Sequence, residues 1–297
     1  MSAAVVRSGI RIKDRIHAGY KKFKQSKRSD RMLVLVGLVI VIGIIFLGAL
    51  GTLLTPYSPY TMAPSTLSPP SIQHPFGTDI LGRDVFSRIV YGTRISLMVA
   101  GLATFLSIGL GILSGSLSGF FGGPIDQVLS LVMDALFSFP TVILALAISF
   151  ALGTGVVNTA IAVGIASAPL SYRTVRSLVL SVKEHGFIEA SKAIGAGDLY
   201  IITRHVLPNT LSSLSVLASF TVAQSIVNVA SLGFLGLGVQ QPTPEWGADI
   251  NMNQGVLSIG VWWAPIFPAL MIFFFALGVN SLAEGINAMF KTEIERR

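Results

Sequence analysis

The sequence predicts an all-α, polytopic membrane protein with six transmembrane helices. Hydrophobic residues make up 52% of the 297 residues, charged residues make up only 12%, and the mean hydropathy is +0.72. This composition is typical of a chain whose main solvent is lipid. The chain also contains charge-free apolar runs longer than the roughly 20 residues that a helix needs to cross a bilayer.

Each predicted span is an apolar run bounded by polar or helix-breaking residues. The first follows a basic leader that is too long for a signal peptide, and the second is rich in small residues that allow close helix packing. Pro140 is expected to kink the third span, and a Gly-Thr-Gly turn at 153–155 separates it from the fourth. The six runs are 32–55, 95–125, 127–152, 156–180, 210–232 and 262–283.

These spans give a domain organisation in five parts. An outer loop follows the first helix, because residues 56–75 contain six of the 14 prolines and little periodicity. The parts are a basic cytoplasmic N-terminal segment (1–31), the first transmembrane helix (32–55), the outer loop (56–93), a core of five helices (94–290) that includes a loop at 185–209, and a cytoplasmic tail (291–297).

The distribution of basic residues predicts the orientation. Ten of the 21 Lys and Arg residues precede Met32. In the six-span topology 18 of them are cytoplasmic, and only Arg83, Arg88 and Arg94 are outside, as the positive-inside rule requires. Both termini are therefore expected in the cytoplasm of a cell membrane protein. The net charge of +7 indicates topology and contact with anionic lipid rather than nucleic-acid binding.

Several classes of chemistry lack the residues that they need. The chain has no cysteine, which excludes disulfides, thiolate metal sites and thiol catalysis. It has no phosphate-binding loop of the Gly-x-x-x-x-Gly-Lys-Ser/Thr type, so it is not expected to hydrolyse ATP or to act as an enzyme. Neither a metal-ligand set nor a cofactor site is predicted.

The polar segment 187–209 lies between the fourth and fifth spans. Glu189-Ala190-Ser191 opens a small-residue helix face, and Gly195 and Gly197 provide a turn. Leu207-Pro208 closes the segment, since proline suits the first turn of the next helix. The pattern predicts a short amphipathic helix that lies beneath the membrane.

This segment resembles the cytoplasmic coupling loop of the membrane subunits of ATP-binding cassette importers. The family pattern is Glu-Ala-Ala, three free positions, Gly, nine free positions, Ile, one free position and Leu-Pro. Ser191 replaces the second Ala, and His205 stands where Ile is expected. The resemblance implies that the loop engages an ATPase through Glu189, Ala190, Ser191, Gly195, Ala196, Gly197, Asp198, Leu207 and Pro208.

A second motif series follows the first helix. It reads His-Pro-Phe-Gly-Thr-Asp at 74–79, Gly-Arg-Asp at 82–84 and Ser-Arg at 87–88. This series is similar to dipeptide, oligopeptide and nickel importer subunits. A catalytic interpretation of His74, Asp79 and Asp84 is less favoured than ion pairs that hold the loop together, because no nucleophile accompanies them.

The resemblance implies a multi-subunit machine. The chain would form half of a pore with a second, similar permease, and a solute-binding protein would deliver cargo outside. Two ATPase subunits would bind ATP and Mg²⁺ inside, and membrane lipid would surround the helices. Dipeptides or oligopeptides are the expected cargo, with oligosaccharides and nickel chelates as alternatives.

The candidates for the transport pathway are Asp134, Phe234, Glu245, Trp246 and Asp249. Asp134 is an ionisable group within the third span. It is either a proton or cation site, which would suit an ion-coupled secondary carrier, or the partner of Arg173 or Arg176. The other four lie in or beside a Gly-rich outer stretch and would face the receptor or the solute. An interfacial anchor is the alternative role for Trp246, as for Trp262 and Trp263.

Overall fold

Helix α2 (Arg28–Leu54) opens the computed structural model, which describes residues 28–294. Its apolar sequence leaves most of its surface exposed, as expected for a helix in lipid. It packs on α11 (Trp263–Ile294), where a side chain at Gly37 would collide with the backbone of Gly278. The described residues form helices and loops with only two isolated β-bridges, so the all-α prediction is confirmed.

The most extensive helix contact joins α3 (Val85–Phe121) to α6 (Val156–Lys183). Gly111, Gly115 and Gly119 are four residues apart and therefore lie on one face of α3. A Cβ atom added at Gly115 would lie 2.9 Å from the carbonyl oxygen of Tyr172, so only glycine permits this approach. The small residues predicted to allow close packing do so here.

The third predicted span is not one helix. Helix α4 (Gly123–Phe137) and helix α5 (Thr141–Leu152) meet at an angle of 94°. Pro140 lacks a backbone N–H and caps the start of α5, so the helical hydrogen bonds stop here. The expected kink is thus a complete break, so one continuous helix over 127–152 was wrong, while a single span over these residues stays a prediction. Gly153, with φ of 82°, ends α5 at the expected turn.

Three short elements connect α6 to the next long helix. They are α7 (Gly186–Ala193), α8 (Asp198–Ile201) and a π-helical turn (Ile202–Val206), which continue into α9 (Leu207–Phe234). Pro208 occupies the first turn of α9, as the sequence predicts. Helix α10 (Trp246–Asn253) and a 3₁₀ turn (Gln254–Ile259) precede α11.

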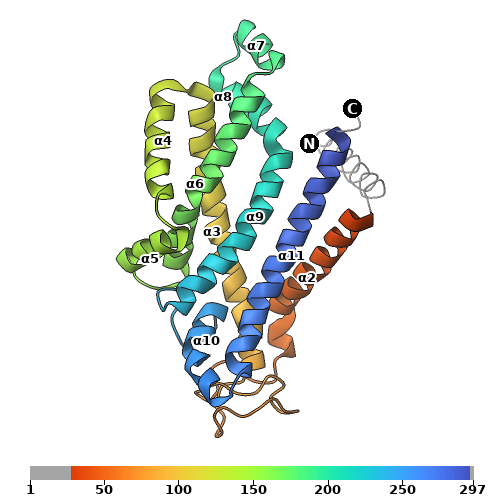
Figure 1. Ribbon diagram of the computed structural model, residues 1–297, viewed down its shortest axis with the longest axis vertical. Helices are drawn as coiled ribbons and strands as arrows, with labels where there is room; N and C mark the ends of the chain where they lie inside the picture. The colour runs from red at the N-terminus through yellow and green to blue at the C-terminus, as the bar shows by residue number, and fades with distance from the viewer. Residues whose placement is uncertain (1–27, 295–297) are drawn as a thin grey trace, which may run out of the picture.

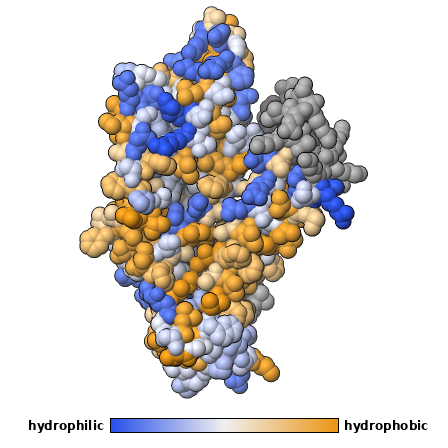
Figure 2. Space-filling view, in the orientation of Figure 1, coloured by the Kyte–Doolittle hydropathy of each residue, from blue (hydrophilic) through white to orange (hydrophobic). Residues whose placement is uncertain are grey.

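The molecule has two distinct ends (Figure 1). Helix α7, the start of α2 and the final turns of α11 lie toward one end, here called the α7 end. Helix α10 and the loop at 55–84 lie at the opposite end, here called the α10 end. Apolar side chains gather across the middle of the surface, and hydrophilic ones gather near α7 (Figure 2). This distribution suits a protein whose middle is in lipid.

The number of spans is not settled by length and composition. In the described part, four helices are long and apolar enough to cross a membrane, and the bent α4–α5 pair would raise the number to five. Helix α6 has 28 residues but carries Arg173, Arg176 and Lys183 and buries many small and polar residues against α3. The six-span count therefore stays a prediction.

The predicted end of the outer loop differs from the structure. Helix α3 begins at Val85, well before the expected end of the outer loop at residue 93. The predicted boundary follows the end of the charged residues, but Arg88 and Arg94 lie inside this helix. Most of the basic segment 1–31 and the last residues of the tail 291–297 fall outside the described residues.

Candidate functional site

The α7 segment (residues 184–206) projects from the α7 end of the bundle (Figure 1). The sequence-predicted coupling residues fall on it and on the start of α9. Ser191 is buried, and Ala196 and Leu207 are half-buried. The exposed ones are Glu189, Ala190, Gly195, Gly197, Asp198 and Pro208. Most of the predicted set is thus accessible on one projecting surface.

A buried apolar cluster fixes the α7 segment to the bundle. Ile188 and Ile201 are 1% and 0% exposed, and Ile202 and Val206 are also buried. They pack with residues of three long helices: Phe120 of α3, Val175 and Val179 of α6, and Leu214 and Leu217 of α9. Because the tip is exposed and its base is buried, a force on the tip would reach all three helices.

The turn after α7 depends on glycine. Gly195 has φ of 83°, a left-handed conformation that other residues rarely adopt. Its N–H donates to the carbonyl of Lys192 at 2.9 Å, and the N–H of Ala196 donates to the carbonyl of Ser191 at 3.1 Å. These bonds satisfy the last carbonyls of α7 and direct the chain back to the bundle.

The α7 segment also carries exposed apolar residues that the sequence analysis did not single out. Ile194 is 85% exposed and Leu199 is 73% exposed, and Phe187 and Tyr200 are also exposed. The His205 ring lies 5.6 Å from Tyr200 and 6.4 Å from Phe187. The sequence did contain a signal for them, namely apolar residues beside a glycine turn in an otherwise polar loop. Such residues are unfavourable in contact with water, so their presence there indicates a binding surface.

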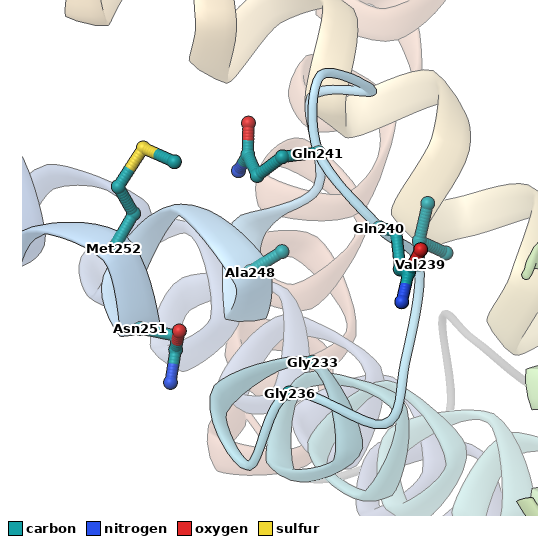
Figure 3. A pocket seen from close by; sticks show the side chains of 8 residues that line it. All are labelled: Gly233, Gly236, Val239, Gln240, Gln241, Ala248, Asn251 and Met252. Atoms are coloured by element: carbon teal, nitrogen blue, oxygen red, sulfur yellow. The ribbon is translucent and has the colours of Figure 1, made fainter. Parts of the chain in front are cut away.

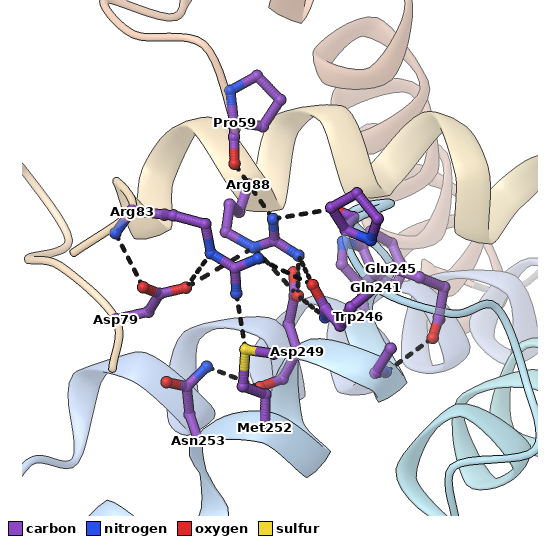
Figure 4. Close-up of polar contacts among 12 residues, drawn as sticks. Pro59, Asp79, Arg83, Arg88, Gln241, Glu245, Trp246, Asp249, Met252 and Asn253 are labelled. Carbon is purple, nitrogen blue, oxygen red and sulfur yellow. Dashed lines mark hydrogen bonds and ion pairs between the residues drawn. The ribbon is translucent and has the colours of Figure 1, made fainter. Parts of the chain in front are cut away.

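A buried ion-pair cluster fastens the α10 end (Figure 4). It consists of Asp79, Arg83, Arg88, Gln241 and Asp249, and its four charged members are at most 4% exposed. Arg83 Nε donates to Asp79 at 2.7 Å, and Arg88 Nε donates to Asp249 at 3.1 Å. Gln241 Oε1 accepts from both arginines, at 2.9 and 3.0 Å. The cluster joins the 55–84 loop, α3 and α10.

Glu245 and Trp246 lie beside this cluster, in the interior. Glu245 caps α10, and its carboxylate accepts hydrogen bonds from the N–H groups of Gly247 and Ala248 and from Ser96. Burial raises the pKa of Glu245 to about 7, although these hydrogen bonds lower it. Trp246 is 0% exposed and donates to the carbonyl of Ile89, so its interpretation as an interfacial anchor was wrong.

A pocket of about 310 Å³ opens at the same end, between the end of α9 and α10 (Figure 3). Gly233, Gly236 and Ala248 leave room for it, while Gln240 and Asn251 line it with amide groups. Gln241 and Met252 belong to its wall and also accept hydrogen bonds from Arg83. Phe234, partly exposed, lies near it and accepts a hydrogen bond from Asn251. Glu245, Trp246 and Asp249 do not line this pocket.

The loop at 55–84 and the start of α3 are joined by contacts of His74, Asp79 and Asp84. His74 Nδ1 lies 2.9 Å from Asp84 Oδ1, and Asp84 Oδ2 accepts from the N–H of Ser87 at 2.7 Å as the cap of α3. Asp79 accepts from Arg83 and from two backbone N–H groups of its own loop. These contacts hold the loop together.

Asp134 pairs with Arg173 at 2.7 Å, and the guanidinium of Arg173 also lies 3.8 Å from the centre of the Phe137 ring. Both charged side chains are about half exposed. Arg176, the other proposed partner, binds Asp126 instead. The described residues contain no group of three or more His, Asp or Glu side chains placed to hold a metal ion.

These features define the class of protein: a helical membrane protein with a buried ion-pair cluster at one end and a projecting loop at the other end. Comparison with known proteins identifies the family. Residues 107–296 match the family described as binding-protein-dependent transport system inner membrane component, and the chain belongs to this family. The resemblance to importer membrane subunits is therefore confirmed.

The relatives found by sequence include glutathione transport system permease proteins. The protein GsiD of Escherichia coli O6:K15:H31 is 40% identical over 211 residues, which cover 71% of this chain and 69% of that protein. GsiD of Pectobacterium atrosepticum is 39% identical over 211 residues, covering 71% and 70%. A solved structure of the MetNI methionine ABC transporter in an inward-facing conformation matches with a TM-score of 0.53 at 20% identity, covering 67% of this chain and 96% of that chain. This last match shows a shared fold.

Proposed function

We propose that this chain is the permease subunit that forms half of the pore of an ATP-driven importer of dipeptides or oligopeptides. Family membership supports a role in binding-protein-dependent transport. The relatives named for glutathione, a tripeptide, support peptide cargo. Oligosaccharides and nickel chelates are the alternative cargoes for the same machinery, and identification of the ligand on the cognate binding protein distinguishes the three.

One observation carries the proposal: the α7 segment has an exposed tip and a buried base. The exposed side chains of Ile194 and Leu199 give a partner apolar surface to bury, and Glu189 adds a charge. Ile188 at the base contacts the cluster that joins α3, α6 and α9. An ATPase that moves the tip would therefore move the helices that line the pore.

The proposal specifies the partners and the orientation. A second, similar permease completes the pore, two ATPase subunits bind ATP and Mg²⁺ at the α7 end, and a solute-binding protein docks at the α10 end. The α7 end is then cytoplasmic, together with both termini, in agreement with the excess of basic residues before Met32. Membrane lipid surrounds the apolar middle.

The test is co-purification with the ATPase and measurement of hydrolysis stimulated by the loaded binding protein. Glu189→Arg reverses a charge on the tip, and Gly195→Val places a β-branched residue at φ of 83°, which displaces the end of α7. Both variants are expected to lose most of the stimulated hydrolysis while the protein stays in the membrane. Glu284→Arg makes the same charge change on an exposed residue of α11, outside the α7 segment, and is expected to retain the stimulated hydrolysis.

Two outcomes would contradict the proposal. Full stimulation in both tip variants would mean that the α7 segment does not couple to an ATPase. Uptake that follows an ion gradient and ignores ATP would instead identify an ion-coupled carrier.

A further inference from the structure

A second pocket, of about 280 Å³, lies where the α4–α5 break faces α6 and α9. Its wall includes Phe137 and Thr141 beside the break and Ser167 of α6. Helix α9 contributes Phe220, Gln224 and Asn228. No charged side chain lines this pocket. We call it the amide pocket.

The α9 residues of the amide pocket form one stripe. Phe220, Gln224 and Asn228 are four residues apart, so they lie one above the other on a single helix face. All three belong to the apolar stretch 198–234 that is long enough to cross a membrane. An amide group in such a stretch is costly in lipid unless it faces a protein partner, water or a solute.

The polar groups of the amide pocket have unused hydrogen-bonding capacity. Ser167 Oγ is buried and has no hydrogen-bond partner among the described residues. Within that same part of the chain, the side chains of Gln224 and Asn228 make no hydrogen bond, although Asn228 is only 8% exposed. Each amide offers two N–H donors and one carbonyl acceptor. The stripe therefore presents donors and acceptors that are not used within this chain.

We propose that the amide pocket is a transit site for the main chain of the peptide cargo. Gln224 and Asn228 would exchange hydrogen bonds with the N–H and C=O groups of peptide bonds, and the Phe137 and Phe220 rings would contact cargo side chains. Because the lining is uncharged, the site recognises the part that all peptides share and is indifferent to the sign of their side chains. This inference rests on the proposed function.

The volume of the amide pocket suits a site whose wall is completed by the second permease. Its volume is slightly below the roughly 300–1,000 Å³ of complete small-ligand sites. It can therefore enclose part of a tripeptide, and the second permease would supply the remaining wall. The competing occupant is a side chain of that second permease, which would fill the pocket permanently.

The first experiment uses the assembled importer in proteoliposomes, with trialanine, glutathione and a trialanine analogue in which one amide is replaced by an ester. Gln224→Leu and Asn228→Leu keep the side-chain volume approximately but remove the amide. Each is expected to lower uptake of both peptides about tenfold, since the loss of one hydrogen bond to the cargo corresponds to roughly this factor. ATP hydrolysis stimulated by the loaded binding protein is expected to change less than twofold.

The ester analogue tests recognition of the peptide bond itself. At saturation of the binding protein, the ester is expected to lower uptake by the unmodified importer and to cause little further loss in the two Leu variants, because the lost interactions are the same. Asn280→Leu removes an exposed amide from α11, outside the amide pocket, and is the matched control. It is expected to transport like the unmodified protein.

The second experiment distinguishes the occupants, and it benefits from a chain without cysteine. Gln224→Cys and Asn228→Cys are expected to react with a water-soluble maleimide in the assembled importer and to be protected by trialanine. Labelling is measured as an increase in the apparent mass of this subunit on a gel. Absence of labelling in every nucleotide state would show that the second permease fills the pocket and would overturn the inference.

The remaining outcomes separate the two proposals. Leu variants that transport both peptides at the unmodified rate overturn the transit site but leave the importer intact. If Asn228→Leu loses stimulated hydrolysis together with uptake, and Asn228→Gln restores both, then the role of Asn228 is structural and the transit site is overturned. An unmodified importer that transports neither peptide contradicts the proposed function itself.

Discussion

The two ends of the molecule are held by different interactions. At the α10 end, the 55–84 loop, α3 and α10 are joined by buried ion pairs with at most 4% exposure. At the α7 end, the projecting segment is joined by a small apolar cluster around Ile188, and its tip is open to solvent. Ion pairs constrain distance and direction, whereas apolar contacts permit small sliding movements. The comparison teaches that one end is held by directional contacts in the interior, whereas the other is held only at its base and leaves its tip exposed.

The largest expected effect comes from breaking an ion pair at the α10 end. Arg88→Met leaves Asp249 buried with neither oxygen bound to a guanidinium, and Asp249 Oδ2 already has no partner among the described residues. We expect a loss of about 3–5 kcal/mol in the free energy of unfolding. Thermal unfolding of the detergent-purified protein measures it. The double variant Arg88→Met/Asp249→Leu should recover part of the loss, and a loss below about 1 kcal/mol would show that this end is not held by the pair.

A pH experiment on Glu245 gives the next largest effect. This residue lies outside the predicted spans, and burial raises its pKa from 4.5 to about 7. Between these values the folded protein holds a proton that the unfolded chain has lost, so its contribution to stability falls as pH rises from about 4.5 to about 7. The decrease is up to about 3 kcal/mol. Melting temperatures at pH 5 and pH 8 measure it, and Glu245→Gln should have a smaller decrease than the unmodified protein. Equal decreases in both would contradict the burial argument.

Loosening the base of the α7 segment should have a smaller effect on stability and a large effect on coupling. Ile188→Ala removes buried methyl groups, and we expect a loss of about 2 kcal/mol, at the low end for such changes because α7 has only eight residues. Hydrogen exchange of residues 186–206 should accelerate. Ile194→Ala, at an 85% exposed position, is the control for stability and should leave hydrogen exchange unchanged. Unaltered exchange in Ile188→Ala would mean that the apolar cluster does not hold the segment.

The exposed pair between Asp134 and Arg173 gives the smallest expected effect. Both side chains are about half exposed, and such pairs contribute about 0–1 kcal/mol. Asp134→Asn should therefore change the melting temperature little. Measured uptake across a pH gradient then tests the remaining interpretation of Asp134. If uptake by the unmodified protein depends on the proton gradient, and uptake by Asp134→Asn does not, then Asp134 is a proton site.

The sequence was sufficient for features that depend on local chemistry. Apolar runs located the long helices, and Gly195 and Pro208 located the turn and the start of α9, because positive φ and a missing N–H impose those conformations regardless of the rest of the fold. The small residues of α3 indicated close packing, although their partner, α6, depends on the three-dimensional arrangement.

Features that depend on contacts between distant residues were not predictable in this way. Arg88 and Asp249 are 161 residues apart, and nothing in either neighbourhood identifies the other as its partner. Trp246 was expected to face the receptor or the solute, with an interfacial anchor as the alternative, but tertiary packing buries it against Ile89. Likewise, Pro140 indicated a kink, but the size of the bend depends on how α5 packs on α6 and α9.

Helix α3 links the two ends directly. It has 37 residues and no proline, which gives an unbroken rod of about 55 Å. Arg88 in its first turns belongs to the ion-pair cluster, and Phe120 in its last turn belongs to the apolar cluster beneath α7. Because the helix is continuous between these two clusters, a tilt or shift of the whole of α3 moves residues of both. Helix α3 is therefore a single element that contacts both the ion-pair cluster and the apolar cluster beneath α7.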